Sequence, residues 1–308
     1  MKAIMYHYVR KYDSRLPYFK FLDLKNFGLQ LDYFEKEFGF VTIDDFKETI
    51  LNKNKSTNNK VVLTFDDGLK DHYKYVFPEL VKRNLWGIFY VPTLPFSKNK
   101  FLGVHLIHLL SGSVEIRKLN LQLESLISEE MIPDSKVKEF REETYKNQNN
   151  SRELNSFKRI LNYYIDYSNR DLILEKLVVM NNITVNLEDF YLKINEIKEM
   201  ENEGMIFGSH SVSHPVMSKL KYKEQENEVK DSFNLLDSVC SSSGIKTFCF
   251  PYGGFHSFNS KTIEILNKNN CDFSFNVESR DIDMNDLNFN IQSLPRYDCN
   301  EFKFGSIS

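Results

Sequence analysis

The chain has 308 residues, of which 41% are hydrophobic and 27% charged, and its formal net charge is -3. This is the composition of an ordinary globular protein. No block of Lys and Arg is long enough to indicate a surface for nucleic acid or for an anionic membrane. No apolar run approaches the roughly 18 residues of a transmembrane helix, and the apolar N-terminal stretch breaks at His7, unlike a signal peptide. We therefore expect a cytoplasmic protein.

Short apolar runs, rich in β-branched and aromatic residues, predict strands, and helical periodicity between them predicts helices. The predicted strands are 3–6, 61–65, 87–91, 205–208, 247–250 and 273–276. The predicted helices are 71–84, 190–203, 218–239 and 260–269. Strands that alternate with helices indicate an α/β fold with a parallel sheet or barrel.

Residues 95–189 differ from the rest of the chain. Strand signals fade there, charges of both signs mix, and stretches such as RELNSFKRILNYYIDY have helical spacing. We expect a barrel formed by residues 1–94 and 190–308, interrupted by a mainly helical insertion. The insertion is either a scaffold or oligomer contact, or a lid over the substrate site.

The four cysteines are not spaced as a C-x-x-C pair, so neither a zinc ribbon nor a redox motif is predicted. We expect buried or half-buried free thiols, as in a reducing compartment.

Two adjacent carboxylates, Asp66 and Asp67, follow the apolar strand in VVLTFDDG. Successive strand side chains point to opposite sides, so the two can take different roles, one on a metal and one as a base. The alternative is a plain Asp-Asp-Gly turn.

Two histidines, His210 and His214, follow another apolar strand in MIFGSHSVSHP. If the loop turns helically, imidazoles four residues apart share one face and can hold one cation. Together with one carboxylate they form a three-ligand site with open positions for water, as in catalytic zinc enzymes. The alternative is a pair of exposed surface histidines.

A third stretch, FCFPYGG, ends an aromatic strand in a rigid turn around Tyr252. Such a turn can aim a backbone N–H at a developing oxyanion, although in isolation it indicates only a turn.

The stretches TFDDG, HSVSHP and FPYG, in this order, resemble the polysaccharide deacetylase family, also called the NodB-homology or carbohydrate esterase four family. The resemblance covers roughly residues 1–94 and 190–300. It implies a distorted (β/α) barrel of about seven strands. It also implies that Asp67, His210 and His214 hold a divalent metal, that Asp66 is the general base, and that the Tyr252 N–H binds the oxyanion.

The chain departs from the family pattern in its source of the general acid and in the position of an arginine. Many members supply the general acid from a Leu-x-His motif near the C-terminus, but this chain has SLPRYD there and no histidine after His256. His7, in MYHYV, is the candidate acid, since a branch that deacetylates poly-N-acetylglucosamine in biofilms has a similar N-terminal Tyr-His. The alternative is a structural histidine that ends the first strand. Arg296 either replaces the family's arginine that orients the base or forms an ordinary surface ion pair.

The function implied by the resemblance is metal-dependent hydrolysis of the N-acetyl group of an amino sugar, in a glycan or a glycan precursor. Imidazole and carboxylate ligands suit zinc, and cobalt, nickel or iron can bind the same donors. Two hydrolase alternatives use the same site, a sugar deformylase and an O-acetyl esterase. A third alternative is a non-catalytic glycan-binding protein. The sequence predicts an acetylated amino sugar as the partner and leaves the oligomeric state open.

Overall fold

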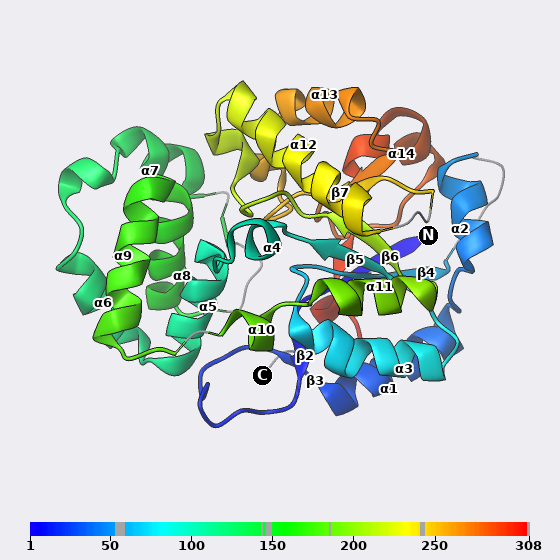
Figure 1. The fold of residues 1–308 in the computed structure, drawn as a ribbon, viewed down its shortest axis with the longest axis horizontal. Coiled ribbons are helices and arrows are strands. Elements are labelled where there is room, and N and C mark those ends of the chain that lie inside the picture. Colours follow the sequence, from blue (N-terminus) through cyan, green and yellow to red (C-terminus); the bar gives the residue numbers. More distant parts are fainter. Residues whose placement is uncertain (53–58, 143, 146–149, 185, 241–243, 307–308) are drawn as a thin grey trace. The chain divides into compact units, whose positions relative to one another are not determined.

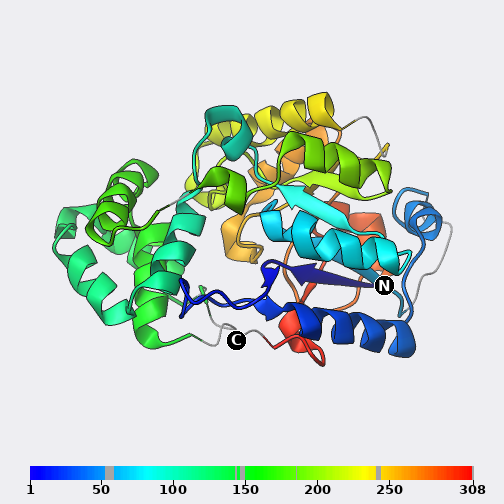
Figure 2. The same ribbon diagram turned by 60° about the horizontal axis from the view of Figure 1, so that its bottom comes forward.

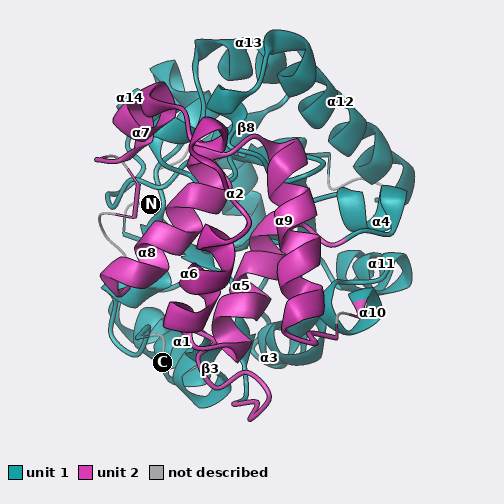
Figure 3. Cartoon of the chain, turned by 90° about the vertical axis from the view of Figure 1, so that its left-hand side faces the viewer, with its two compact units in different colours: residues 1–11, 21–100, 187–308 teal, residues 12–20, 101–186 magenta. Residues whose placement is uncertain are grey.

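The computed structural model describes residues 1–52, 59–142, 144–145, 150–184, 186–240 and 244–306. These residues form two compact units, coloured separately in Figure 3. Unit 1 comprises Met1–Lys11, Phe21–Lys100 and Leu187–Ser308, and unit 2 comprises Tyr12–Lys20 and Phe101–Asn186. Unit 2 therefore includes the short segment Tyr12–Lys20, which the sequence analysis assigned to the barrel. Within the described ranges, none of the helices combines the length and the apolar character needed to cross a bilayer.

Unit 1 is built on a curled sheet of seven parallel strands in the order β8-β7-β6-β5-β4-β1-β9 (Figure 1). The strands are β1 (Lys2–Tyr6), β4 (Val61–Phe65), β5 (Ile88–Val91), β6 (Ile206–Ser209), β7 (Thr247–Cys249), β8 (Phe273–Phe275) and β9 (Tyr297–Asp298). A separate parallel pair consists of β2 (Val9–Arg10) and β3 (Leu22–Asp23). The six predicted strands are all present, and the predicted distorted (β/α) barrel is confirmed.

The segment before β9 joins the two edges of the sheet, which the sequence did not predict. Leu294 bridges to Phe275 of the edge strand β8. Three and four residues later, Tyr297 and Asp298 pair with Ile4 and Met5 of β1. Arg296 lies between these two contacts, so the same short segment that links the sheet edges also carries this arginine.

The helices of unit 1 surround the sheet (Figures 1 and 2). They are α1 (Leu24–Glu37), α2 (Ile43–Ile50), α3 (Phe77–Lys82), α4 (Leu94–Lys98), α10 (Leu187–Phe190), α11 (Ile194–Asn202), α12 (Tyr222–Val239), α13 (Ser260–Lys268) and α14 (Met284–Phe289). A π-helical turn, His72–Val76, leads into α3. The helix predicted from residue 218 begins at Tyr222, because the Glu224 side chain accepts the Lys221 backbone N–H and so caps the helix there.

Alternation along the strands separates two apolar cores. Tyr6 and Phe65 face the outer core, where Phe27 of α1 packs against both rings. Val62, Tyr90 and Phe273 belong to the inner core of the curled sheet. Because side chains alternate along a strand, Thr64 and Asp66 lie on the same side as Val62, toward the interior.

All regular secondary structure among the described residues of unit 2 is helical, and the unit has a hydrophobic core of its own. Its helices are α5 (Gly103–Ser113), α6 (Ile116–Glu124), α7 (Asp134–Phe140), α8 (Arg152–Arg159) and α9 (Tyr167–Met180), with a π-helical turn at Ile160–Tyr164. The core contains Ile107, Leu110, Leu119, Phe157, Leu161, Leu174 and Leu177.

The packing of the inner core can be tested by substituting Gly208 of β6. A Cβ atom there would lie 2.5 Å from Tyr90 Cε1 and 2.7 Å from Thr247 Cγ2, so Gly208→Ala must displace well-packed side chains. We expect this variant to lower the free energy of unfolding by about 1–3 kcal/mol in urea titrations. Gly28→Ala in α1 is the control, because its nearest atoms are 3.8 Å away and alanine favours a helix. Equal stability of the two variants would contradict this packing.

Candidate metal centre and active site

The predicted site residues meet at one edge of the sheet. His7 follows β1, Asp66 and Asp67 follow β4, His210 follows β6, and Tyr252 lies just beyond β7. Because the strands are parallel, their carboxyl ends share this edge, where barrel enzymes form their active sites. The tertiary structure thus brings together side chains that are distant in the sequence.

Asp67, His210 and His214 form a compact group of buried donors. Asp67 Oδ1 lies 3.6 Å from His210 Nε2 and 3.4 Å from His214 Nε2. Ligand atoms about 2.1 Å from one tetrahedrally coordinated ion are about 3.4 Å from one another. The two distances from Asp67 therefore match those of a metal site, and all three donor atoms lie within 4.8 Å of one another. The set of two nitrogens and one oxygen suits zinc and its neighbours in the first transition row.

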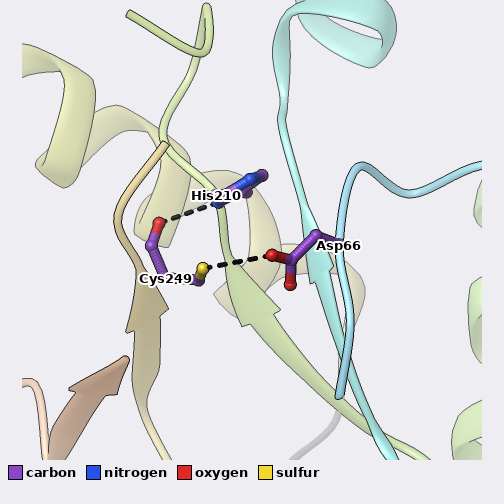
Figure 4. A group of neighbouring side chains, drawn as sticks. All are labelled: Asp66, His210 and Cys249. Atoms are coloured by element: carbon purple, nitrogen blue, oxygen red, sulfur yellow. Dashed lines mark hydrogen bonds between the residues drawn. The ribbon is translucent and has the colours of Figure 1, made fainter. Parts of the chain in front are cut away.

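The tautomer of His210 is fixed by a backbone contact. His210 Nδ1 donates a hydrogen bond to the Cys249 carbonyl oxygen over 2.8 Å, which leaves the lone pair on Nε2 (Figure 4). Burial lowers the pKa of His210, although the charges of Asp66 and Asp67 oppose that effect. The neutral imidazole with a fixed second nitrogen is the form that binds metals.

The loop that carries the two histidines is not helical, so the conditional expectation of a helical turn is wrong. Ser211 and His214 instead have left-handed backbone angles, with φ of 65° and 56°. The loop bends, and the two imidazole centroids lie 4.7 Å apart. The spacing of four residues therefore does bring the two imidazoles together, but a strained bend achieves this in place of a helical turn.

Asp66 is held by a buried ion pair with Arg296. The guanidinium donates from Nη1 to Oδ1 and from Nη2 to Oδ2, each over 2.8 Å. It also contacts Thr64 Oγ1 and the carbonyl oxygen of Asn276. Burial alone would raise the pKa of Asp66, but Arg296 outweighs it and the pKa is lowered to about 2. Arg296 is fully buried, which excludes the surface ion pair considered from the sequence.

A second group of donors, Asp66, His210 and Cys249, also lies close together (Figure 4). Here, however, Arg296 Nη2 is 2.8 Å from Cys249 Sγ and already neutralises Asp66. The thiol in turn donates to Asp66 Oδ2 over 3.5 Å. The guanidinium thus serves as the cation of this group, which leaves Asp67, His210 and His214 as the group suited to a metal ion. The sequence identified Cys249 only as a free thiol.

His7 and Tyr252 border the same centre. His7 Nε2 is 4.0 Å from Asp66 Oδ2, and its side chain is 38% exposed, so a substrate can reach it. The buried His72 Nε2 donates to the His7 carbonyl oxygen over 3.0 Å and so fixes the backbone at this point. The Tyr252 ring packs on the His214 ring with centroids 5.0 Å apart, and Tyr252 has a positive φ of 65°. The sequence analysis had assigned no role to His72.

The Asp66–Arg296 pair predicts a pH-dependent loss of stability. Arg296→Met should destabilise the metal-free protein by about 3–5 kcal/mol near neutral pH, because a buried carboxylate loses its partner. The pKa of Asp66 is below its unfolded value, so the pair contributes stability at neutral pH and loses it as the pH falls toward 2. Urea unfolding at several pH values should therefore show the largest deficit at neutral pH and a smaller one near pH 3. The double variant Asp66→Asn/Arg296→Met should recover part of the loss; a pH-independent deficit would contradict the ion-pair explanation.

Comparisons with known proteins give a family match over part of the chain. Residues 178–274, which include His210, His214 and Tyr252, match the family model "Polysaccharide deacetylase". None of the curated proteins compared with the sequence matches it.

Among solved structures, the chain is similar to the deacetylase PplD of Streptococcus pyogenes in complex with acetate (TM-score 0.59, 17% identity, covering 97% of this chain and 91% of that one). It is also similar to IcaB from Ammonifex degensii (TM-score 0.52, 18% identity, covering 89% and 82%). A de-N-acetylase from Aggregatibacter actinomycetemcomitans gives a TM-score of 0.53 at 14% identity, covering 96% and 93%. At these identities the structural likeness establishes the fold alone. The family match confirms the resemblance over residues 178–274, which carry two of the three motifs, and the similar structures share the fold.

Proposed function

We propose that this protein is a metal-dependent hydrolase that removes the acetyl group from the nitrogen of an amino sugar in a glycan or a glycan precursor. The observation that carries the proposal is the spacing of 3.4–3.6 Å between Asp67 Oδ1 and the two histidine Nε2 atoms, next to a second carboxylate held by Arg296. Asp67 can thus bind a metal, and Asp66 can accept a proton.

Asp67, His210 and His214 would hold the divalent ion, for which zinc is the first candidate and cobalt, nickel and iron are the others. When bound, such an ion lowers the pKa of water toward neutrality and polarises a carbonyl oxygen. Three protein ligands leave at least one tetrahedral position open, which distinguishes a catalytic from a structural site.

Asp66 is the proposed general base. Arg296 keeps its carboxylate ionised and aimed at the centre, since both oxygens accept bonds from the guanidinium. A carboxylate with a pKa of about 2 is a weak base, so its role depends on an acidified water. Oδ2 also accepts from the Cys249 thiol, whereas Oδ1, which accepts from Arg296 Nη1, has a second lone pair with which to accept the proton.

His7 and Tyr252 complete the proposed site. An amide nitrogen must be protonated as it leaves, because an amide anion is too basic to expel, and His7 is the exposed titratable group beside Asp66. The backbone N–H of Tyr252 would stabilise the oxyanion; one such donor is typically worth about 3–4 kcal/mol.

The direct test is an acetate-release assay over N-acetylated amino sugars, as monomers and as oligomers, with metal added and then chelated. We expect acetate only from the metal-loaded protein. Formate from an N-formyl sugar, or acetate from O-acetyl sugars alone, would instead support the deformylase or the esterase. A metal-free protein that binds glycans without releasing acetate would support the glycan-binding alternative.

Matched Asp→Asn variants test the division of roles between the two neighbouring carboxylates. Asp66→Asn should reduce kcat by at least about 100-fold and retain the bound metal, because it removes the base. Asp67→Asn should lose metal affinity, because it removes a ligand. Metal content by mass spectrometry and the rate of acetate release distinguish the two. If Asp66→Asn loses the metal as Asp67→Asn does, the assignment of the roles is wrong.

The role of His7 can be tested with substrates that differ in their leaving groups. His7→Ala should slow amide hydrolysis by about 100-fold or more, and it should leave the metal content unchanged. It should slow hydrolysis of an aryl acetate much less, because a phenolate leaves without protonation. His108→Ala, in unit 2, is the control. Equal losses on both substrates would show that His7 is not the acid.

A further inference from the structure

The loop between the two candidate histidine ligands is strained and needs support from outside itself. Ser211 and His214 are non-glycine residues with positive φ, a conformation that costs of order 1 kcal/mol for each residue. Such a loop persists only where its surroundings determine it. The backbone N–H groups of Thr93 and Leu94 donate to the Ser211 and Val212 carbonyl oxygens, and the supporting side chains come from α12.

Glu228 of α12 accepts three hydrogen bonds from the middle of this loop. The backbone N–H groups of Val212 and Ser213 both donate to Oε2 over 2.8 Å. The Ser213 hydroxyl donates to Oε1 over 2.6 Å. A carboxylate that accepts several N–H and O–H donors forms charge-assisted bonds, which are stronger than neutral ones.

A second chain of hydrogen bonds starts from the same face of α12. Ser232, one turn after Glu228, donates to the carbonyl oxygen of Val229, so the 2.6 Å contact between the hydroxyls has Ser209 as the donor. The Ser209 hydroxyl in turn accepts the backbone N–H of Ser211 over 3.1 Å.

The last contact of the network reaches the second histidine. The His214 backbone N–H donates to the Ser211 hydroxyl over 3.0 Å. The backbone from Ser209 to His214 is therefore connected to two side chains of one helix face, those of Glu228 and Ser232.

We propose that Glu228, assisted by Ser232, is a positioning residue that fixes the loop so that His210 and His214 present their Nε2 atoms at the spacing of one cation. This inference rests on the proposed function, since it assigns Glu228 an effect on metal affinity through the loop. Outer groups that orient metal ligands typically contribute 10–100-fold in affinity.

The experiment is a competition of Co²⁺ and Zn²⁺ binding against a chelator, with the visible spectrum of the Co²⁺ form as a report of ligand geometry. Glu228→Ala should weaken metal binding about 10–100-fold and alter the Co²⁺ spectrum. Glu228→Gln keeps an acceptor for the two backbone N–H groups and should give an intermediate loss. Glu226→Ala, on the same helix and ion-paired with the exposed Lys223, should behave as the wild type.

The free energy of unfolding of the metal-free variants shows whether a loss of metal affinity comes from the position of the loop or from a general loss of stability. If Glu228→Ala does not fold, Glu228→Gln and Ser232→Ala carry the same comparison. A folded Glu228→Ala variant with wild-type affinity and an unchanged Co²⁺ spectrum would overturn the proposal. A wild-type protein that binds no metal would overturn the proposed function instead, whereas loss of metal in Asp67→Asn together with no effect of Glu228→Ala would overturn only the positioning role.

Discussion

The buried ion pair of Arg296 and Asp66 is the interaction on which the rest of the site depends. Arg296 comes from the segment that joins the two edges of the sheet, and Asp66 follows the end of strand β4. One contact therefore links the closure of the barrel to the active edge. A buried carboxylate without this partner would be strongly unfavourable. The fold places Arg296 beside Asp66 and so keeps the carboxylate ionised, and the ion pair in turn stabilises the fold.

The same ion pair gives two adjacent aspartates different environments. Asp66 faces the interior and has a guanidinium as its counter-charge, whereas Asp67 lies next to two imidazoles. The positive φ of 81° at Asp67 turns the chain between them. Because Arg296 also contacts Cys249, a metal is not needed in the deeper donor group, and the outer group is the one suited to it.

Support for the histidines comes from a different part of the molecule. The Cys249 carbonyl oxygen fixes the tautomer of His210, while Glu228 holds the bend between His210 and His214. A helical turn would have satisfied its own backbone groups. The observed bend cannot do so, and it uses a carboxylate and two hydroxyls from neighbouring elements. Strain at the site is thus compensated by contacts that lie outside the motifs.

The strands that carry the motifs, the α/β class and the candidates His7, Asp66, Asp67, His210, His214 and Tyr252 could be identified from the sequence. These features follow from local hydrophobic periodicity and from residues close together in the chain. The sequence left two roles open for Arg296, and only the folded chain shows that it pairs with Asp66, 230 residues away. The contacts of Cys249 with both residues and of Glu228 with the histidine loop also appear only in the folded chain. Strand β9 and the segment Tyr12–Lys20 were missed for the same reason. A local pattern records which face of an element is buried, but it contains no information on which distant side chain completes a hydrogen bond or an ion pair.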